Sequence, residues 1–163
     1  MANIVEIYRG ANVAENVSRI YRGSTLQFER QSNDPAVQAL LDQAVIDGFT
    51  AASGDALDAL NDFVIELKAQ GIWTLLDVLW LPATNGDSDF ACYNLKDPTQ
   101  FNLTKVNSPA FTSLEGFTGD GVSAYLDTNF SPSNNSIVAS QNSQSFGIYT
   151  RSQTTSGNQG GGY

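Results

Sequence analysis

Histidine is absent from this 163-residue chain, and cysteine occurs once, as Cys92. Without histidine, neither a Ser-His-Asp or Cys-His nucleophilic site nor a histidine-based zinc site can form. One thiol cannot make an intrachain disulfide or a CxxC metal site, so we expect Cys92 to be a small buried residue. These absences favour a protein that is not an enzyme and that holds no cofactor or metal ion.

Basic residues are also scarce, with eight lysines and arginines against 17 acidic residues and a net charge of −9. Nucleic-acid binding depends on neutralising phosphates with Lys and Arg, so this class of partner is excluded. The imbalance is concentrated in residues 31–90, where ten acidic residues accompany Lys68 alone. The solvated face of amphipathic helices is the simplest explanation for this acidic segment.

A long hydrophobic run is missing too. The most apolar stretch, residues 72–81, is about half as long as a membrane span and contains Asp77. The first residues lack the apolar stretch behind a basic start that marks a secretory signal. We therefore expect synthesis in a cytoplasm and no membrane insertion.

The tetrapeptide IYRG occurs twice within residues 1–31, at Ile7 to Gly10 and at Ile20 to Gly23. Each copy is a short β-favouring run closed by a glycine turn, so the pattern predicts a small β-meander. A meander of this size has apolar residues on both faces and unpaired edges, and it needs a partner surface. We expect it to anchor the chain or to join copies of it, for example as a trimer, through Ile7, Tyr8, Ile20, Tyr21 and Phe28.

The next segment, residues 32–82, has the spacing of apolar residues that is typical of amphipathic helices. A first helix is predicted over residues 34–47, because Asp34 is a natural N-cap and is followed by Pro35. A glycine ends this helix. A second helix is predicted from Gly54 or Asp55 to Gln70, with Ser53 as its N-cap and another glycine at its end.

A third helix is predicted over residues 72–81, where Pro82 ends it. So much of its surface is apolar that it should be buried between other elements. Trp73 and Trp80 lie seven residues apart in this stretch. Stacking on sugars is one use of such tryptophans, but burial in a helical seam explains them better.

From residue 83 on, turn residues separate short strand patterns. Alternation or a β-favouring composition predicts strands at residues 90–95, 102–108, 122–128 and 144–151. A Gly- and Ser-rich tail follows, and we expect it to be flexible. The sequence thus predicts the α+β class, divided into residues 1–31, 32–82 and 83–163.

Two pairs of aspartates invite a chemical explanation. Asp87 and Asp89 have the D-x-D spacing of a calcium loop, but the pattern is incomplete and an Asx turn explains the same residues. Asp120 and Asp127 could serve as acid and base in a glycan cleft, but an aspartate in a glycine turn is more often a turn residue. We therefore predict no metal ligand and no catalytic residue.

Three stretches resemble a known arrangement: NDFVIELKAQGIWTLLDVLWLPA at residues 61–83, YNLKDPTQFNLTKVNSPAFTSLEGFTGDGVSAYLDTNFSPS at 93–133, and SQNSQSFGIYTRS at 140–152. They are similar to virion structural proteins of tailed bacteriophages, in which a helical region leads into a laminin-G-like (concanavalin-like) β-sandwich. The resemblance covers residues 35–152. It implies an antiparallel β-sandwich after residue 83, of which this chain supplies about half the strands. We expect truncation from a longer product, with completion by another subunit as the alternative.

The resemblance implies a structural component of a phage virion, made in the host cytoplasm and bound to other virion proteins. The N-terminal part would anchor or oligomerise the chain, and the sandwich would face outward, as in a tail fibre or baseplate. A capsid decoration or head-fibre protein is an alternative. A module that binds host-surface glycans is another, with Tyr125 and Tyr149 on the polar side of the predicted strands as ligand or partner contacts. A glycan-degrading enzyme is a third class, which the missing histidine disfavours.

Overall fold

The computed structural model describes residues 19–22, 25–29 and 32–150, the first two of these as backbone only. The chain divides between Asn33 and Asp34 into two compact units. Ile7 and Tyr8 lie outside the described residues, as do the first IYRG copy and the Gly-rich tail. The side chains of the other three predicted anchor residues also lie outside the description.

The second IYRG copy lies in a β-hairpin. Strand β1 (Arg19–Arg22) pairs antiparallel with β2 (Thr25–Glu29). The register places Ile20 opposite Phe28 and then shifts, so that Tyr21 is opposite Leu26. Residues 20–22 of the second IYRG copy, a β-favouring run, therefore form a strand as predicted.

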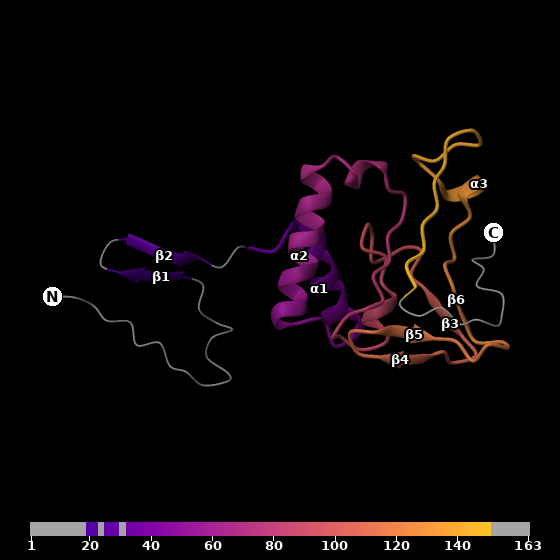
Figure 1. Cartoon of the computed structure of the whole chain (residues 1–163), viewed down its shortest axis with the longest axis horizontal. Helices are drawn as coiled ribbons and strands as arrows, with labels where there is room; N and C mark the ends of the chain where they lie inside the picture. Colours follow the sequence, from indigo (N-terminus) through magenta and orange to yellow (C-terminus); the bar gives the residue numbers. More distant parts are fainter. Residues whose placement is uncertain (1–18, 23–24, 30–31, 151–163) are drawn as a thin grey trace. The chain divides into compact units, whose positions relative to one another are not determined.

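The first predicted helix is confirmed as α1 (Pro35–Asp47), visible beside α2 in Figure 1. The Asp34 carboxylate accepts a hydrogen bond from the Ala36 N–H at 2.8 Å, and Pro35 occupies the first turn. Gly48 ends the helix in the left-handed conformation, with φ of 75°. Asp34 and Pro35 thus define the start of α1, and Gly48 defines its end.

The second predicted helix is confirmed as α2 (Gly54–Ala69), although the Ser53 side chain makes no capping hydrogen bond. Asn61 is buried in the middle of α2, and its Oδ1 accepts the Asp34 N–H at 2.6 Å. Lys68 forms an ion pair with the Asp34 carboxylate. These two polar contacts fix the start of α1 against one face of α2.

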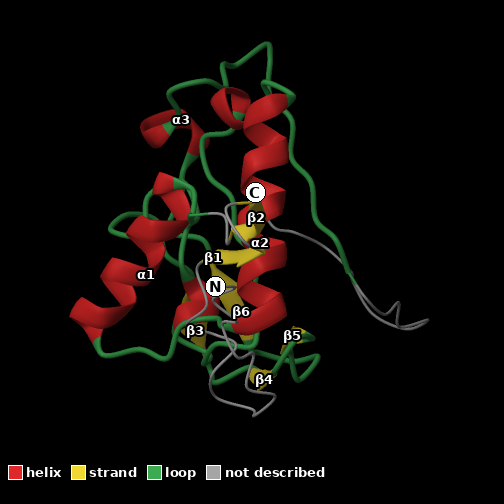
Figure 2. Ribbon diagram, turned by 90° about the vertical axis from the view of Figure 1, so that its left-hand side faces the viewer, coloured by secondary structure: helices red, strands yellow, loops and turns green. Residues whose placement is uncertain are grey.

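One apolar core joins the two helices to a segment that follows them in sequence. Figures 1 and 2 show the backbone of these elements from two sides. Leu40 from α1 and Val64 from α2 are 1% and 0% exposed. Phe90 and Tyr93 meet them from the later segment, with ring centroids 5.7 Å apart in an edge-to-face pair. The other buried members are Val37, Ala44, Ala52 and Leu95.

The third predicted helix is wrong. Only the 3₁₀ helix η2 (Trp73–Leu75) forms, and Leu76 is already extended, with φ of −97° and ψ of 127°. The backbone of Leu79 then pairs with Asn94, whose Oδ1 accepts the Leu79 N–H at 3.1 Å. Apolar spacing predicted a helix here, but fixed polar partners along the extended chain replace the helical hydrogen bonds.

The two tryptophans of this segment are half-buried. Trp73 packs against the core, and Trp80 forms an isolated bridge with Asn94. The Trp80 indole N–H donates to the Phe101 carbonyl at 2.8 Å. Partial burial of both side chains agrees with the preference for a structural role, although no helical seam exists.

The strand predicted at residues 90–95 is also wrong, because the 3₁₀ helix η3 (Phe90–Cys92) lies there. The Asp87 carboxylate accepts the Asp89 and Phe90 N–H groups and so starts a helical turn. Cys92 is buried as predicted, at 5% exposure, and burial raises the pKa of its thiol to about 11.

Two small antiparallel sheets follow. Strand β3 (Thr104–Val106) pairs with β6 (Tyr125–Asp127), and β4 (Ala110–Thr112) pairs with β5 (Gly116–Thr118). Helix α3 (Pro132–Asn135) is a single turn after β6. Mixed helix and antiparallel strand confirm the α+β class, whereas a β-sandwich is not confirmed by these two-stranded sheets.

Of the last two strand predictions, the one at residues 122–128 is confirmed in part and the one at residues 144–151 is not found in the described residues. Strand β6 begins at Tyr125 rather than Val122, because the Asp120 carboxylate holds the N–H groups before it. Within residues 144–150 no strand is present, and every side chain is exposed. An alternating pattern becomes a strand only where a neighbouring strand continues the ladder of backbone hydrogen bonds along it.

Candidate functional site

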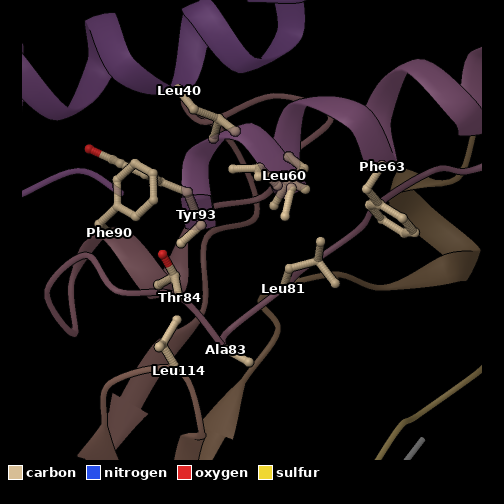
Figure 3. A pocket seen from close by; sticks show the side chains of 12 residues that line it. Leu40, Leu60, Phe63, Leu81, Ala83, Thr84, Phe90, Tyr93 and Leu114 are labelled. Carbon is tan, nitrogen blue, oxygen red and sulfur yellow. The ribbon is translucent and has the colours of Figure 1, made fainter. Parts of the chain in front are cut away.

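An apolar pocket of about 260 Å³ lies between α2, the extended segment after η2 and the β4–β5 turn (Figure 3). Phe90, Tyr93 and Leu95 of the core form part of its wall. Three of the lining residues are alanines, whose small side chains leave the volume of the pocket unfilled. The lining is completed by Leu40, Ala56, Ala59, Leu60, Phe63, Leu81, Ala83, Thr84 and Leu114.

The polar atoms of the lining are used within the protein. The Thr84 hydroxyl accepts the Gly86 N–H at 3.2 Å, and the Tyr93 hydroxyl donates to Asp47 at 2.6 Å. Burial raises the pKa of Tyr93 above its ordinary value, and the hydrogen bond to the Asp47 carboxylate raises it further. The pocket therefore offers apolar contact and no acid or base.

Leu114 stands at the rim in a strained conformation. Its φ is 62°, and its N–H donates to the Thr84 carbonyl at 2.8 Å. For a leucine the left-handed region costs roughly 1–2 kcal/mol. The side chain is nevertheless 60% exposed, so apolar burial does not offset this cost. Phe63, 39% exposed, is a second large apolar side chain at the pocket.

An acidic stripe runs along α2 beside the pocket. Its members follow one another at helical spacings of three or four residues and therefore lie on one face. This face adjoins the face that carries Ala56, Ala59 and Phe63, since each of these follows an acidic residue by one position. All four acidic side chains are exposed: Asp55, Asp58, Asp62 and Glu66.

The predicted calcium candidates are turn residues, as the Asx-turn alternative implies. Asp87 accepts N–H groups from Thr50 at 2.6 Å and from Phe90 at 2.8 Å. Burial alone would raise its pKa, but these hydrogen bonds lower the pKa below its ordinary value. Asp89 instead pairs with Lys105 at 2.8 Å. Among residues 32–150 no group of three or more His, Cys, Asp or Glu side chains is placed to hold a metal ion.

The two acid–base candidates lie in different elements, Asp120 in the turn before β6 and Asp127 at the end of β6. The Asp120 carboxylate accepts N–H groups from Ala124, Ser123 and Val122 at 2.8–2.9 Å. These hydrogen bonds hold the pKa of Asp120 far below its ordinary value, which disfavours proton donation near neutral pH. Asp127 accepts the Asn129 N–H at 2.9 Å.

The aromatic candidates for glycan contact lie away from the pocket lining. Tyr125 in β6 is 55% exposed, and Tyr149 is 91% exposed. Trp73 is covered by cations, because the ammonium groups of Lys96 and Lys68 lie 4.4 and 5.1 Å from its ring centroid. A sugar could stack freely on the two tyrosines, but on Trp73 only after displacing the lysines.

Asp77 has a structural role that the sequence did not predict. Its carboxylate accepts N–H groups from Ile137, Val138 and Ala139 and the hydroxyl proton of Ser136, at 2.6–2.9 Å. Burial opposes ionisation, but the four hydrogen bonds lower the pKa of Asp77 to about 2. A lone aspartate inside an apolar run was the available signal.

Comparison with known proteins identifies no relative. No protein-family model, curated protein or solved structure matches the chain. In the part of the chain that the structure describes, no helix has the length and apolarity to cross a bilayer.

Proposed function

We propose that this protein is a structural component of a tailed-phage virion. Its N-terminal part anchors the chain to the particle or joins copies of it, and its C-terminal part faces outward. The observation that supports this best is the use of three carboxylates, Asp77, Asp87 and Asp120, each of which holds several N–H groups of a turn or loop. These carboxylates serve to hold the backbone, and we propose no enzymatic role.

The exposed apolar side chains support an assembly role. Phe146, Ile148 and Tyr149 are 65%, 59% and 91% exposed on one short segment after the last helix. Isolated apolar side chains on a surface are ordinary, but a run of three within four residues favours contact with another molecule. The resemblance of residues 35–152 to phage virion proteins gives that partner a class, namely other virion proteins.

A laminin-G-like sandwich is part of the proposal. The β3–β6 and β4–β5 sheets have two strands each and so present open edges. Strands from a longer product or from another subunit would extend them. Residues 144–150 have the alternating pattern of a strand but form none in this structure, and they would add to the same layers.

Glycan binding is the second candidate function. The exposed rings of Tyr125 and Tyr149 favour it, since an aromatic face is the usual platform for a sugar ring. A capsid decoration or head-fibre position is an alternative location for the same structural role.

Immunoelectron microscopy of purified particles tests the proposal, with an antibody against residues 141–150, all of which are exposed. Label at the tail tip would support a fibre or baseplate role and justify a glycan-array screen with Tyr125→Ala and Tyr149→Ala as controls. Label over the head would favour the decoration alternative. Absence of label, together with absence of the chain from particle mass spectrometry, would refute the virion proposal.

A deletion of residues 2–30 tests the anchor separately. The body begins at Asp34 as its own unit, so the deletion should leave its helices folded by circular dichroism. We expect the shortened chain to be lost from particles. Normal incorporation would show that the anchor lies elsewhere.

A further inference from the structure

We infer that the apolar pocket and the acidic stripe of α2 together form a docking site for a peptide segment of a partner protein. The segment that fits carries one large apolar side chain flanked by arginine or lysine. This inference goes beyond the proposed function, because it concerns binding by the isolated protein and holds whether or not the chain is found in particles.

The pocket sets the apolar part of the ligand. Its volume of about 260 Å³ exceeds the roughly 150 Å³ of an engineered protein cavity that binds benzene, so an aromatic or branched aliphatic side chain fits. Ala59 is exposed at the α2 wall, and Figure 3 shows Phe63 and Leu114 on opposite sides of the space. The hydroxyl oxygens of Thr84 and Tyr93, the polar side-chain atoms of the lining, already take part in hydrogen bonds within the protein. An apolar anchor is therefore what it accepts.

The residues at the rim of the pocket support a role in binding. Leu114 occupies a left-handed backbone position that favours glycine or asparagine, yet it leaves most of its side chain in solvent. Folding gains little from a leucine at this position. A partner that covers the pocket would bury Leu114 and Phe63 together and would give the strained residue a use.

Charge complementarity sets the flanking part of the ligand. Three of the four acidic residues of α2, Asp55, Asp58 and Asp62, each directly precede a residue of the pocket lining. Lys68, the single cation of α2, is paired with Asp34. Cationic side chains on either side of the anchor would meet this stripe. An acidic segment would be repelled, and a neutral apolar molecule would leave the stripe unused.

Selection from a displayed library of random eight-residue peptides, with the full chain as bait, tests the inference. We expect enriched peptides to carry Phe, Trp, Leu or Ile next to Arg or Lys. No enrichment, or enrichment without basic residues, would overturn the proposal. Enrichment of sequences found in this chain would still support the site and would make a second copy the partner.

Matched variants then locate the binding of the best peptide, measured by fluorescence anisotropy. Ala59→Leu narrows the mouth and should weaken binding about tenfold, the effect of losing one apolar anchor. Ala69→Leu, also exposed on α2 but outside the lining, should change nothing. If Ala59→Leu fails to fold, Leu114→Ser serves instead. Equal binding by a folded rim variant and the parent would refute the site.

The charge step has its own pair of variants. Asp55→Asn combined with Asp62→Asn should weaken the same peptide about fivefold and reduce its salt dependence, because screening acts on exposed charges. Asp42→Asn on the exposed surface of α1 is the control and should have less than a twofold effect. If binding resists both 0.5 M salt (about three times the physiological value) and the double substitution, the acidic stripe has no role.

Discussion

The helical region, residues 34–71, and the C-terminal region, residues 104–150, are held together by different forces. Val37, Leu40 and Val64 of the helical region are almost completely buried. In the C-terminal region the structure records no large apolar side chain among the buried residues. Carboxylates and amides there hold the chain by hydrogen bonds instead, as Asp77 does for residues 136–139. One region rests on non-directional burial and the other on a few polar atoms in fixed places.

Because of this difference, the two regions should be sensitive to different substitutions. A buried apolar stripe tolerates exchanges that keep its volume, because burial does not depend on the direction of single bonds. A loop held by one carboxylate loses several hydrogen bonds at once when that carboxylate is removed or protonated. The expected effects therefore fall from the helical core to the exposed turns.

The largest effect is expected in the core between the helices. Leu40 is 1% exposed and touches the pocket wall, so Leu40→Ala should lower the free energy of unfolding by about 2–5 kcal/mol. Urea unfolding measured by circular dichroism checks this. Val45→Ala, on the same helix but 82% exposed, should change the free energy by less than about 0.5 kcal/mol. Similar losses for both variants would contradict the assigned core.

The junction between the two regions comes next. A Cβ atom at Gly86 would stand 2.7 Å from the Thr50 carbonyl oxygen and 2.7 Å from a ring carbon of Phe90. Because the oxygen belongs to backbone, Gly86→Ala should destabilise the protein by about 1–3 kcal/mol in the same urea assay. Gly147→Ala has open space around it and should be close to neutral. A neutral Gly86→Ala would show that the loop packing described at Thr50 is wrong.

A smaller and more local effect is expected at Asp77. Asp77→Ala removes the acceptor of three N–H groups and one hydroxyl, and should cost about 1–2 kcal/mol, since the released groups can bind water. Hydrogen exchange should speed up at residues 137–139 and stay unchanged within α1. Faster exchange throughout α1 would mean that the two regions are not independently stabilised.

Acid should act on the same loop without a mutation. The folded-state pKa of Asp77 is about 2, below the ordinary 3.8, so its stabilising contribution is complete above the ordinary value. It is lost as the pH falls from about 4 towards 2. Amides 137–139 should therefore lose protection in that window before the interior of α1 does. The pKa of Asp120 is lowered further than that of Asp77, so amides 122–124 should lose their protection at still lower pH. If amides 137–139, amides 122–124 and the interior of α1 all lost protection at the same pH, the two regions would not be stabilised by different forces.

The same contrast explains what the sequence predicts well. The two amphipathic helices follow from local signals, namely apolar spacing and residues such as Asp34, Pro35 and Gly48 at the ends. The extended chain after Leu76 does not, because its partner Asn94 is distant in sequence and is buried by contacts that no local pattern records. Apolar periodicity alone cannot tell a helix from a chain held by remote polar atoms.

The candidate site divides in the same way. The sequence correctly predicted Asp87 and Asp120 as turn residues, because an Asx turn is a local arrangement. Both carboxylates accept hydrogen bonds from backbone N–H groups. The pocket was not anticipated, since it needs α2, the segment at Leu81 and the β4–β5 turn to meet in space. The sign of the pocket in the sequence is the pair Ala56 and Ala59 beside the acidic stripe of α2.

The smallest effect is expected at Leu114, where it is also the most informative. Leu114→Asn places a residue that tolerates the left-handed region at φ of 62°, and removes a side chain that is 60% exposed. We expect the free energy of unfolding to rise by up to about 1 kcal/mol, because relief of strain exceeds the lost contact. Thermal unfolding monitored by circular dichroism measures it, with Thr112→Asn on β4 as a neighbour without strain. If Leu114→Asn is instead clearly destabilising, the leucine supports the fold from within the pocket, and the rim has no need of a partner to account for it.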